Sequence, residues 1–225
     1  MKNAFLAAAL LTGAALATAP AAHAQGVRVG FKAGANYSNI AGDVADEDRF
    51  ENKFGFHGGL LLNADLTGDG FFSIQPELLY SQKGFKNSDF EFNFGSSKYK
   101  RTGSVNYNYL DLPILAKINA DGLFFELGPQ FSYLLNIKDK TKVESSIPGI
   151  PSYDVTAAQK LDDVNRFELG YAAGLGYQAD SGPMIGLRYN GAFTDFAKDA
   201  YQNGSFKNAR NSAFQLYVGY LLGGK

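Results

Sequence analysis

Apolar and polar residues alternate along most of this chain. The segment from Val27 to Ser38 reads VRVGFKAGANYS, with apolar side chains at odd positions and polar or small residues at even positions. A period of two residues is typical of a β-strand whose two faces differ chemically. The same alternation returns along the chain and predicts eight strands, at about 27–38, 54–66, 71–83, 105–118, 123–138, 166–178, 183–195 and 211–222.

The connections between these strands alternate as well. Long polar segments at about 39–53, 84–103, 139–165 and 196–210 alternate with three tight turns. In barrels of the bacterial outer membrane, short turns and long loops alternate in this way, and an even number of strands places both chain ends on the short-turn side. Each segment is also long enough for a tilted strand to cross a bilayer, which takes about 9–11 residues. We therefore expect an all-β fold, an eight-stranded antiparallel up-and-down transmembrane β-barrel, as one domain over residues 25–225.

The charged residues of the strands share one face, and the opposite face holds aliphatic and aromatic residues. An eight-stranded barrel has an interior only just wide enough for side chains, so it could not enclose the whole apolar face. Reversed faces would place basic residues in lipid at roughly 2–4 kcal/mol each. The sequence therefore predicts a lipid-facing apolar surface and a lumen that contains Arg28, Lys32, Glu77, Asp111, Lys117, Glu126, Glu168 and Arg188.

Charges that are buried in a lumen must be paired. Cations and carboxylates balance in this set, so we expect a structural, salt-bridged network that plugs the barrel. A narrow polar conduit is the alternative. Aromatic residues near strand ends are candidates for the girdles at the two membrane interfaces, namely Tyr37, Phe54, Tyr80, Tyr133 and Tyr177.

The fourth strand alternates less cleanly than the others. Tyr107 and Tyr109 lie on the opposite parity from Leu110 and the apolar residues that follow it. Either a β-bulge near Tyr109 shifts the pattern, or the two tyrosines point inward. In the fifth strand, the alternation places Ile137 on the lipid face and Asn136 in the lumen.

The first 24 residues resemble a secretory signal peptide. Lys2 supplies the positive start, residues 4–19 form a short apolar stretch, and Ala22-His23-Ala24 matches an A-x-A cleavage site. We expect cleavage after Ala24 and export in a Gram-negative cell. An uncleaved membrane anchor is the alternative.

Composition excludes several classes of function. The chain of 225 residues has a formal net charge of −1, so it has no electrostatic footprint for nucleic acid. It contains no cysteine, which rules out disulfides and zinc–thiolate sites. We expect no cofactor, no metal and no nucleic-acid partner.

Two motifs resemble catalytic or cofactor sites. Residues 174–179 match the dinucleotide spacing G-x-G-x-x-A, but they lie within a predicted strand and lead into a turn rather than a helix. His57 could act as a base in a hydrolase, yet it is predicted to face the lumen, so a structural histidine is the favoured interpretation. We therefore expect no catalytic residue.

Two predicted loops carry charge. The acidic residues between Asp43 and Glu51 lack the spaced ligands of a calcium loop, and we expect a solvated loop there. Basic residues in the second long loop could contact lipopolysaccharide phosphates, namely Lys86, Lys98, Lys100 and Arg101.

Five short runs resemble the PorT-like outer-membrane β-barrel proteins. They are GFKAGANYS at 30–38, QPELLYSQKG at 75–84, YLDLP at 109–113, ELGPQ at 126–130 and GLRY at 186–189. The resemblance covers nearly the whole mature chain in the right order. It implies an outer-membrane barrel of the porin-like kind, and one branch of that family is linked to protein secretion.

We therefore expect a non-enzymatic outer-membrane β-barrel with a structural or interaction role in the cell envelope. The alternatives are a narrow porin that passes ions or small solutes, an accessory component of a secretion system, and an outer-membrane hydrolase. The expected partners are outer-membrane lipid, lipopolysaccharide and other envelope proteins that contact the long loops. We expect a monomer.

Overall fold

The computed structural model describes residues 26–41, 50–95, 97–162, 164–198 and 208–223. The predicted signal peptide at 1–24 and residues 42–49 of the acidic segment lie outside these ranges. Among the described residues, no helix is long and apolar enough to cross a membrane.

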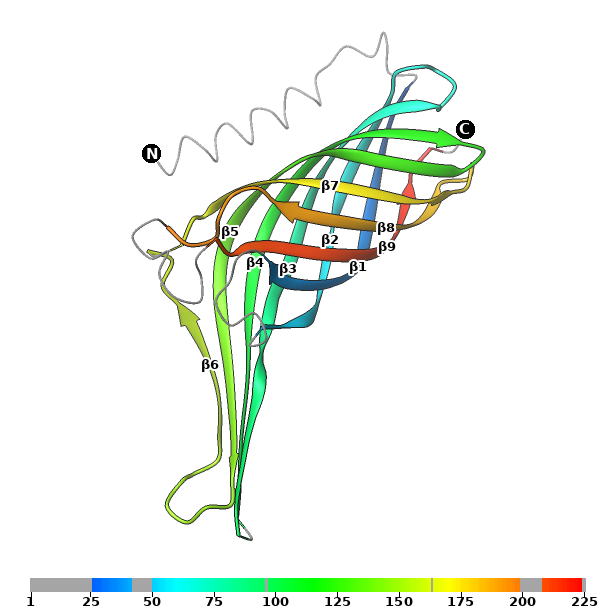
Figure 1. Cartoon of the computed structure of the whole chain (residues 1–225). Coiled ribbons are helices and arrows are strands. Elements are labelled where there is room, and N and C mark those ends of the chain that lie inside the picture. The colour runs from blue at the N-terminus through cyan, green and yellow to red at the C-terminus, as the bar shows by residue number, and fades with distance from the viewer. Residues whose placement is uncertain (1–25, 42–49, 96, 163, 199–207, 224–225) are drawn as a thin grey trace.

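β-strands make up most of the described chain (Figure 1). Tight turns join β2 to β3, β4 to β5 and β7 to β8, and each contains a glycine with positive φ, at Gly68 (82°), Gly122 (87°) and Gly182 (111°). Glycine adopts this left-handed backbone without steric cost, which is why the turns can be so short. The strands are β1 (Val27–Ala41), β2 (Phe50–Asp65), β3 (Phe72–Phe94), β4 (Ser97–Ala120), β5 (Leu123–Ser145), β6 (Tyr153–Gln159), β7 (Phe167–Gln178), β8 (Pro183–Ala192) and β9 (Arg210–Leu221).

Antiparallel pairing closes eight of these strands into a ring. Each strand pairs with the next along the chain, except that β5 pairs with both β6 and β7, and β9 returns to β1. The predicted eight-stranded up-and-down barrel is therefore confirmed. β6 lies outside the ring and was not predicted.

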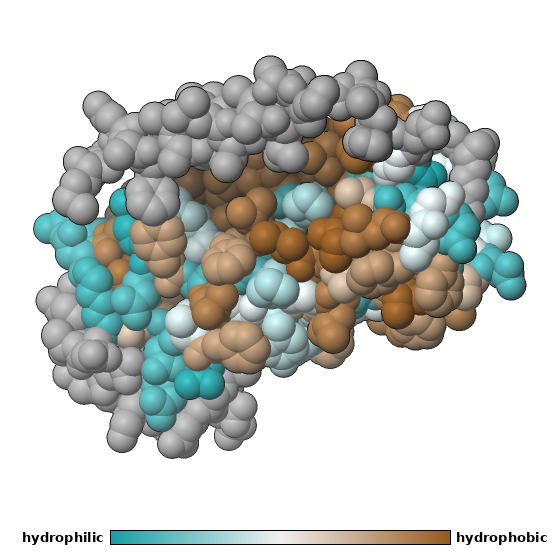
Figure 2. Space-filling view, turned by 90° about the horizontal axis from the view of Figure 1, so that it is seen from above, coloured by the Kyte–Doolittle hydropathy of each residue, from teal (hydrophilic) through white to brown (hydrophobic). Residues whose placement is uncertain are grey.

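The two faces of the barrel wall differ as the alternation predicted. Met184 and Arg188 on β8 are buried, whereas Ile185 and Leu187 are 52% and 49% exposed. The same alternation runs through the other strands of the ring, so charged and amide side chains fill the lumen and apolar side chains cover the outside. Figure 2 shows hydrophobic residues along the middle of the wall and hydrophilic residues toward its ends.

The irregular pattern of the fourth predicted strand arises because its two tyrosines point inward, and a β-bulge lies beside them on β5. The register between β4 and β5 shifts beside Tyr109, where Leu135 has no partner on β4. Tyr107 and Tyr109 both point inward and are buried. Beyond the bulge the faces of β5 exchange, so Ile137 is buried and Asn136 is exposed. The placement expected for these last two residues is wrong, because alternation alone cannot detect an inserted residue.

β3, β4 and β5 continue well beyond the ring, and with β6 they form what we call the extended sheet (Figure 1). It comprises residues 85–94 of β3, 97–106 of β4, 138–145 of β5 and β6 itself. The predicted loop at 84–103 is wrong, and the predicted loop at 139–165 is wrong over β5 and β6. Polar side chains suggested loops, but the antiparallel pairing continues through these segments. A strand that contacts water instead of lipid needs no apolar outward face, so polar residues are compatible with it.

Candidate functional site

Four of the predicted lumen charges meet in the middle of the barrel. Arg188 donates from Nη1 to Glu77 Oε2 at 2.8 Å and from Nε to Glu126 Oε1 at 2.7 Å. Lys32 Nζ lies 2.8 Å from Glu77 Oε1. These side chains come from β1, β3, β5 and β8 and are fully buried. Two cations and two carboxylates therefore neutralise one another across the lumen, and we call them the central ion cluster.

Neutral side chains form hydrogen bonds with the carboxylates of the central ion cluster. Gln75 Nε2 donates to Glu77 Oε1 at 2.7 Å, and the Tyr217 hydroxyl donates to Glu126 Oε1 at 2.9 Å. The ammonium of Lys32 lies 3.8 Å from the centroid of the Tyr217 ring, which favours a cation–π contact. Gly186 leaves space for this ring, because a Cβ there would lie 2.5 Å from its Cζ.

A second ion group lies nearer the long connections. Lys83 Nζ is 3.2 Å from Asp111 Oδ2 and 3.7 Å from Glu168 Oε1. Asn211 also donates to Glu168 Oε2 at 2.5 Å. Asp111 and Glu168 were among the predicted lumen charges, but Lys83 was not. Lys83 has the same parity as Glu77, and that signal could have identified it.

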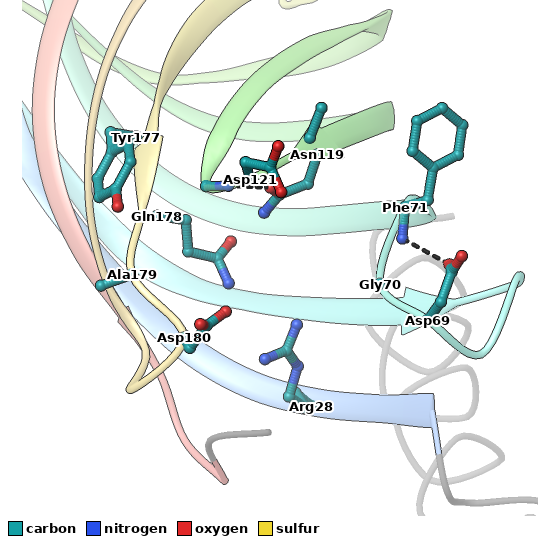
Figure 3. A pocket seen from close by; sticks show the side chains of 12 residues that line it. Arg28, Asp69, Gly70, Phe71, Asn119, Asp121, Tyr177, Gln178, Ala179 and Asp180 are labelled. Carbon is teal, nitrogen blue, oxygen red and sulfur yellow. Dashed lines mark hydrogen bonds between the residues drawn. The ribbon is translucent and has the colours of Figure 1, made fainter.

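The two remaining predicted charges take no part in either ion group. Lys117 Nζ donates to Gln178 Oε1 at 2.7 Å and to Gln75 Oε1 at 3.4 Å, and it forms no ion pair among the described residues. Arg28 points into a hollow of about 650 Å³ at the short-turn end of the barrel (Figure 3). Asp121 and Asp180 line the same hollow.

Buried apolar residues lie in the lumen on both sides of the ion groups. At the long-connection end, a buried cluster fills the mouth, and at the short-turn end a second cluster lies beneath the hollow of Figure 3. A cavity of about 10 Å³ beside Lys83 could hold a single water molecule. The first cluster contains Ile40, Phe85, Tyr107, Tyr109, Leu134, Ile137, Phe196 and Ala209, and the second contains Leu61, Phe124, Met184, Tyr217 and Leu221.

Residues 20–198 match the model of a protein family described as the outer membrane protein beta-barrel domain. The chain belongs to this family. It is therefore an outer-membrane β-barrel, and its strands cross the outer membrane with their apolar faces toward lipid. The predicted fold class and location are confirmed.

Solved structures with a similar arrangement are also barrels of the outer membrane. The chain is 14% identical to the attachment invasion locus protein Ail of Yersinia pestis, with a TM-score of 0.43, over 88% of this chain and 99% of that chain. Neisserial surface protein A is 14% identical, with a TM-score of 0.37, over 85% and 96%. The outer membrane protease OmpT of Escherichia coli is 9% identical, with a TM-score of 0.38, over 88% and 97%. No curated protein matches the chain.

Aromatic rings on neighbouring strands form a belt around the outer-membrane barrel toward its long connections. The ring centroids of Tyr37 and Phe54 are 4.9 Å apart, and those of Tyr133 and Phe167 are also 4.9 Å apart. Further ring pairs are Phe56 with Tyr80, Tyr189 with Phe214 and Tyr171 with Phe193. Of the predicted girdle residues, Tyr177 alone lies at the short-turn end, beside the hollow of Figure 3.

His57 occupies the lumen, as its parity predicted. Its Nδ1 lies 2.7 Å from Asn36 Oδ1, and its Nε2 has no hydrogen-bond partner. Asn36 donates in turn to Ser81 Oγ at 3.0 Å, so an amide separates the imidazole from the serine hydroxyl. The ring is 2% exposed, so it is packed among the side chains of the lumen. The described residues include no cluster of His, Asp or Glu suited to a metal ion.

The basic residues predicted to contact lipopolysaccharide lie on the extended sheet. Lys98 forms an ion pair with Glu91 at 2.8 Å, and Lys100 forms one with Asp89 at 2.9 Å. Arg101 pairs across the sheet with Val143 and lies on the opposite face from these lysines. Lys86 has no ion-pair partner in the described part of the chain. Of the four predicted basic residues, Lys86, Lys98 and Lys100 therefore share one face of the extended sheet, and Arg101 lies on the other.

Proposed function

We propose that this outer-membrane barrel is a non-enzymatic, non-conducting protein with a structural or interaction role in the cell envelope. The observation that carries the proposal is the position of Arg188, which bridges Glu77 and Glu126 across the middle of the lumen. The apolar clusters on both sides of this bridge support a closed lumen.

The extended sheet is the part of the barrel best placed to meet partners. It projects beyond the aromatic belt, on the side of the long connections, where an outer-membrane barrel faces the cell exterior. β6 is exposed along its whole length. We propose that envelope components contact this sheet while the barrel anchors it as a monomer.

The family branch and the cleavage of the signal peptide are part of the same proposal. Residues 75–84 and 109–113 support membership of the PorT-like branch of outer-membrane barrels, and a role in secretion follows from that resemblance alone. The sequence of residues 1–24 supports export with cleavage after Ala24.

Recordings from planar lipid bilayers test the proposal. The refolded mature chain is first shown to be a closed barrel by its shift in gel mobility on heating. We expect no steady openings, while a general porin recorded in the same bilayers conducts. Steady openings of the folded barrel would instead establish a narrow porin.

A second assay addresses catalysis. The folded barrel is incubated with acyl-ester and peptide substrates, and we expect no hydrolysis above the rate of a heat-denatured sample. Hydrolysis that disappears in His57→Ala, with the heat shift retained, would overturn the non-enzymatic assignment.

A further inference from the structure

The outward face of the extended sheet contains a hollow of about 360 Å³ with lysines on its walls. Lys86 on β3 pairs with Ser104 on β4, and Ser104 pairs with Lys140 on β5. Cross-strand partners point to the same face, so the two lysines flank the small serine in one row. Thr102 and Lys142 form the next row, farther from the barrel.

The row of Lys86, Ser104 and Lys140 carries two positive charges, and Glu51 on β2 is the cross-strand partner of Lys86 at the edge of the row. Neither lysine has a carboxylate within ion-pair distance among the described residues. Three other lysines of this face are paired, Lys98 with Glu91, Lys100 with Asp89, and Lys142 with Glu144 at 2.6 Å. The hollow also contains Asp89 and Asp154, but both lie on its distal side, and Asp89 already binds Lys100.

The geometry of the row suits a phosphate group. Neighbouring strands lie about 4.8 Å apart, so the backbones of Lys86 and Lys140 are separated by about 10 Å. Both flexible side chains can reach an anion placed over Ser104, and the serine hydroxyl can donate a further hydrogen bond. Lysine binds phosphate through charge-assisted hydrogen bonds.

The height of the row distinguishes between possible sources of that phosphate. The strand from Tyr80, in the aromatic belt, to Lys86 rises about 20 Å along its axis, or about 15 Å above the belt at the usual tilt. The headgroup layer of a phospholipid leaflet is only about 5–8 Å thick. A phosphate at this height must therefore be carried on a larger headgroup.

The geometry points to a binding site for the phosphorylated saccharide headgroup of an outer-leaflet glycolipid, formed by Lys86, Ser104 and Lys140. This inference rests on the proposed function, because it requires a barrel that is embedded in the outer membrane. It names one partner of the extended sheet. It does not depend on whether the lumen conducts.

Binding of a rough lipopolysaccharide with a phosphorylated core tests the site. The mature chain is titrated with this glycolipid in mixed micelles, and the glycolipid retained on the washed protein is quantified by mass spectrometry. The double variant Lys86→Gln with Lys140→Gln is compared with Lys98→Gln with Lys160→Gln, which removes the same charge outside the hollow. We expect about tenfold weaker retention for the first variant and less than about twofold for the second.

Two further experiments test whether phosphate is the group that binds and whether the glycolipid supplies it. We expect little retention of the same glycolipid after hydrogen fluoride has removed its phosphate esters. Inorganic phosphate alone, titrated by calorimetry, should bind far more weakly than the glycolipid. Equal losses in the two double variants, retention that does not need phosphate, or equally tight binding of inorganic phosphate would each overturn the inference. The heat shift shows that each variant is folded, and bilayer recordings test the proposed function separately.

Discussion

Arg188 on β8 binds both carboxylate oxygens of Glu77 on β3, with Nη1–Oε2 at 2.8 Å and Nη2–Oε1 at 3.0 Å. The two residues are 111 positions apart in the chain, and both side chains are fully buried. Their strands are not neighbours in the ring, so this pair links opposite parts of the wall through the lumen. A buried charge without its partner retains its full desolvation cost, which makes such a link sensitive to substitution.

Glu77→Ala is expected to lower the free energy of unfolding by about 3–5 kcal/mol. The substitution leaves Lys32 without its carboxylate and leaves Arg188 with Glu126 alone. Urea unfolding in lipid vesicles, followed by circular dichroism, measures the change. Glu91→Ala on the extended sheet removes a solvent-exposed ion pair and should cause no measurable change. Equal effects of the two substitutions would show that the central ion cluster does not stabilise the barrel.

Gly34→Ala is expected to destabilise the barrel by about 1–3 kcal/mol through overpacking. A Cβ at Gly34 would lie 2.2 Å from the carbonyl oxygen of Leu216 and 2.7 Å from Cε1 of His57. Gly58 serves as the control, because a Cβ there would lie no closer than 3.5 Å to Lys32 O. The midpoint of urea unfolding should therefore fall in Gly34→Ala and stay constant in Gly58→Ala. A similar midpoint for both variants would contradict the tight packing of the lumen.

The lumen position of Lys32, Glu77 and Arg188 could be predicted because a strand has a strict period of two. Each of these residues lies on the charged parity of its own segment, and no tertiary information is needed to assign its face. Which cation meets which carboxylate could not be predicted, because that depends on the stagger of strands around the ring. Lys83 illustrates the limit, since it pairs with Asp111 from the next strand and Glu168 from a distant one.

The extended sheet was missed for a different reason. Lys98 and Lys100 lie in a polar segment, and polar composition is the usual sign of a loop. Above the membrane, however, both faces of a strand contact water, so the contrast that reveals a membrane strand is lost. The bulge at Leu135 is hidden for a related reason, since one inserted residue leaves each half of β5 with a regular pattern.

Leu127→Arg is expected to cost about 2–4 kcal/mol of folding free energy in bilayers. Leu127 is 61% exposed on the outside of β5, near the middle of the apolar band, so the arginine would enter hydrocarbon. Ser181→Arg, in the turn between β7 and β8, places the same side chain in water and should have little effect. The folded fraction in vesicles, read from the heat shift on gels, measures both. Tolerance of arginine at Leu127 would mean that this face of the barrel does not contact lipid.

The pKa of the Glu91 carboxyl is expected to lie below its usual range, because it accepts a hydrogen bond from Lys98. The two side chains are diagonal neighbours on one face of the extended sheet, where Glu91 pairs with Lys100 and Asn93 pairs with Lys98. Since folding lowers this pKa, the contribution of the pair is present above the carboxyl's ordinary pKa and is lost as the pH falls through the lowered value. Carbon-detected NMR titration in micelles should show the pKa of Glu91 rising in Lys98→Gln. Lys142→Gln, which removes the hydrogen bond to Glu144 instead, should leave the pKa of Glu91 nearly unchanged. If Lys98→Gln leaves that pKa unchanged as well, β3 and β4 do not pair at this end of the extended sheet. The strand pairing that forms the hollow beside Lys86 would then be in error.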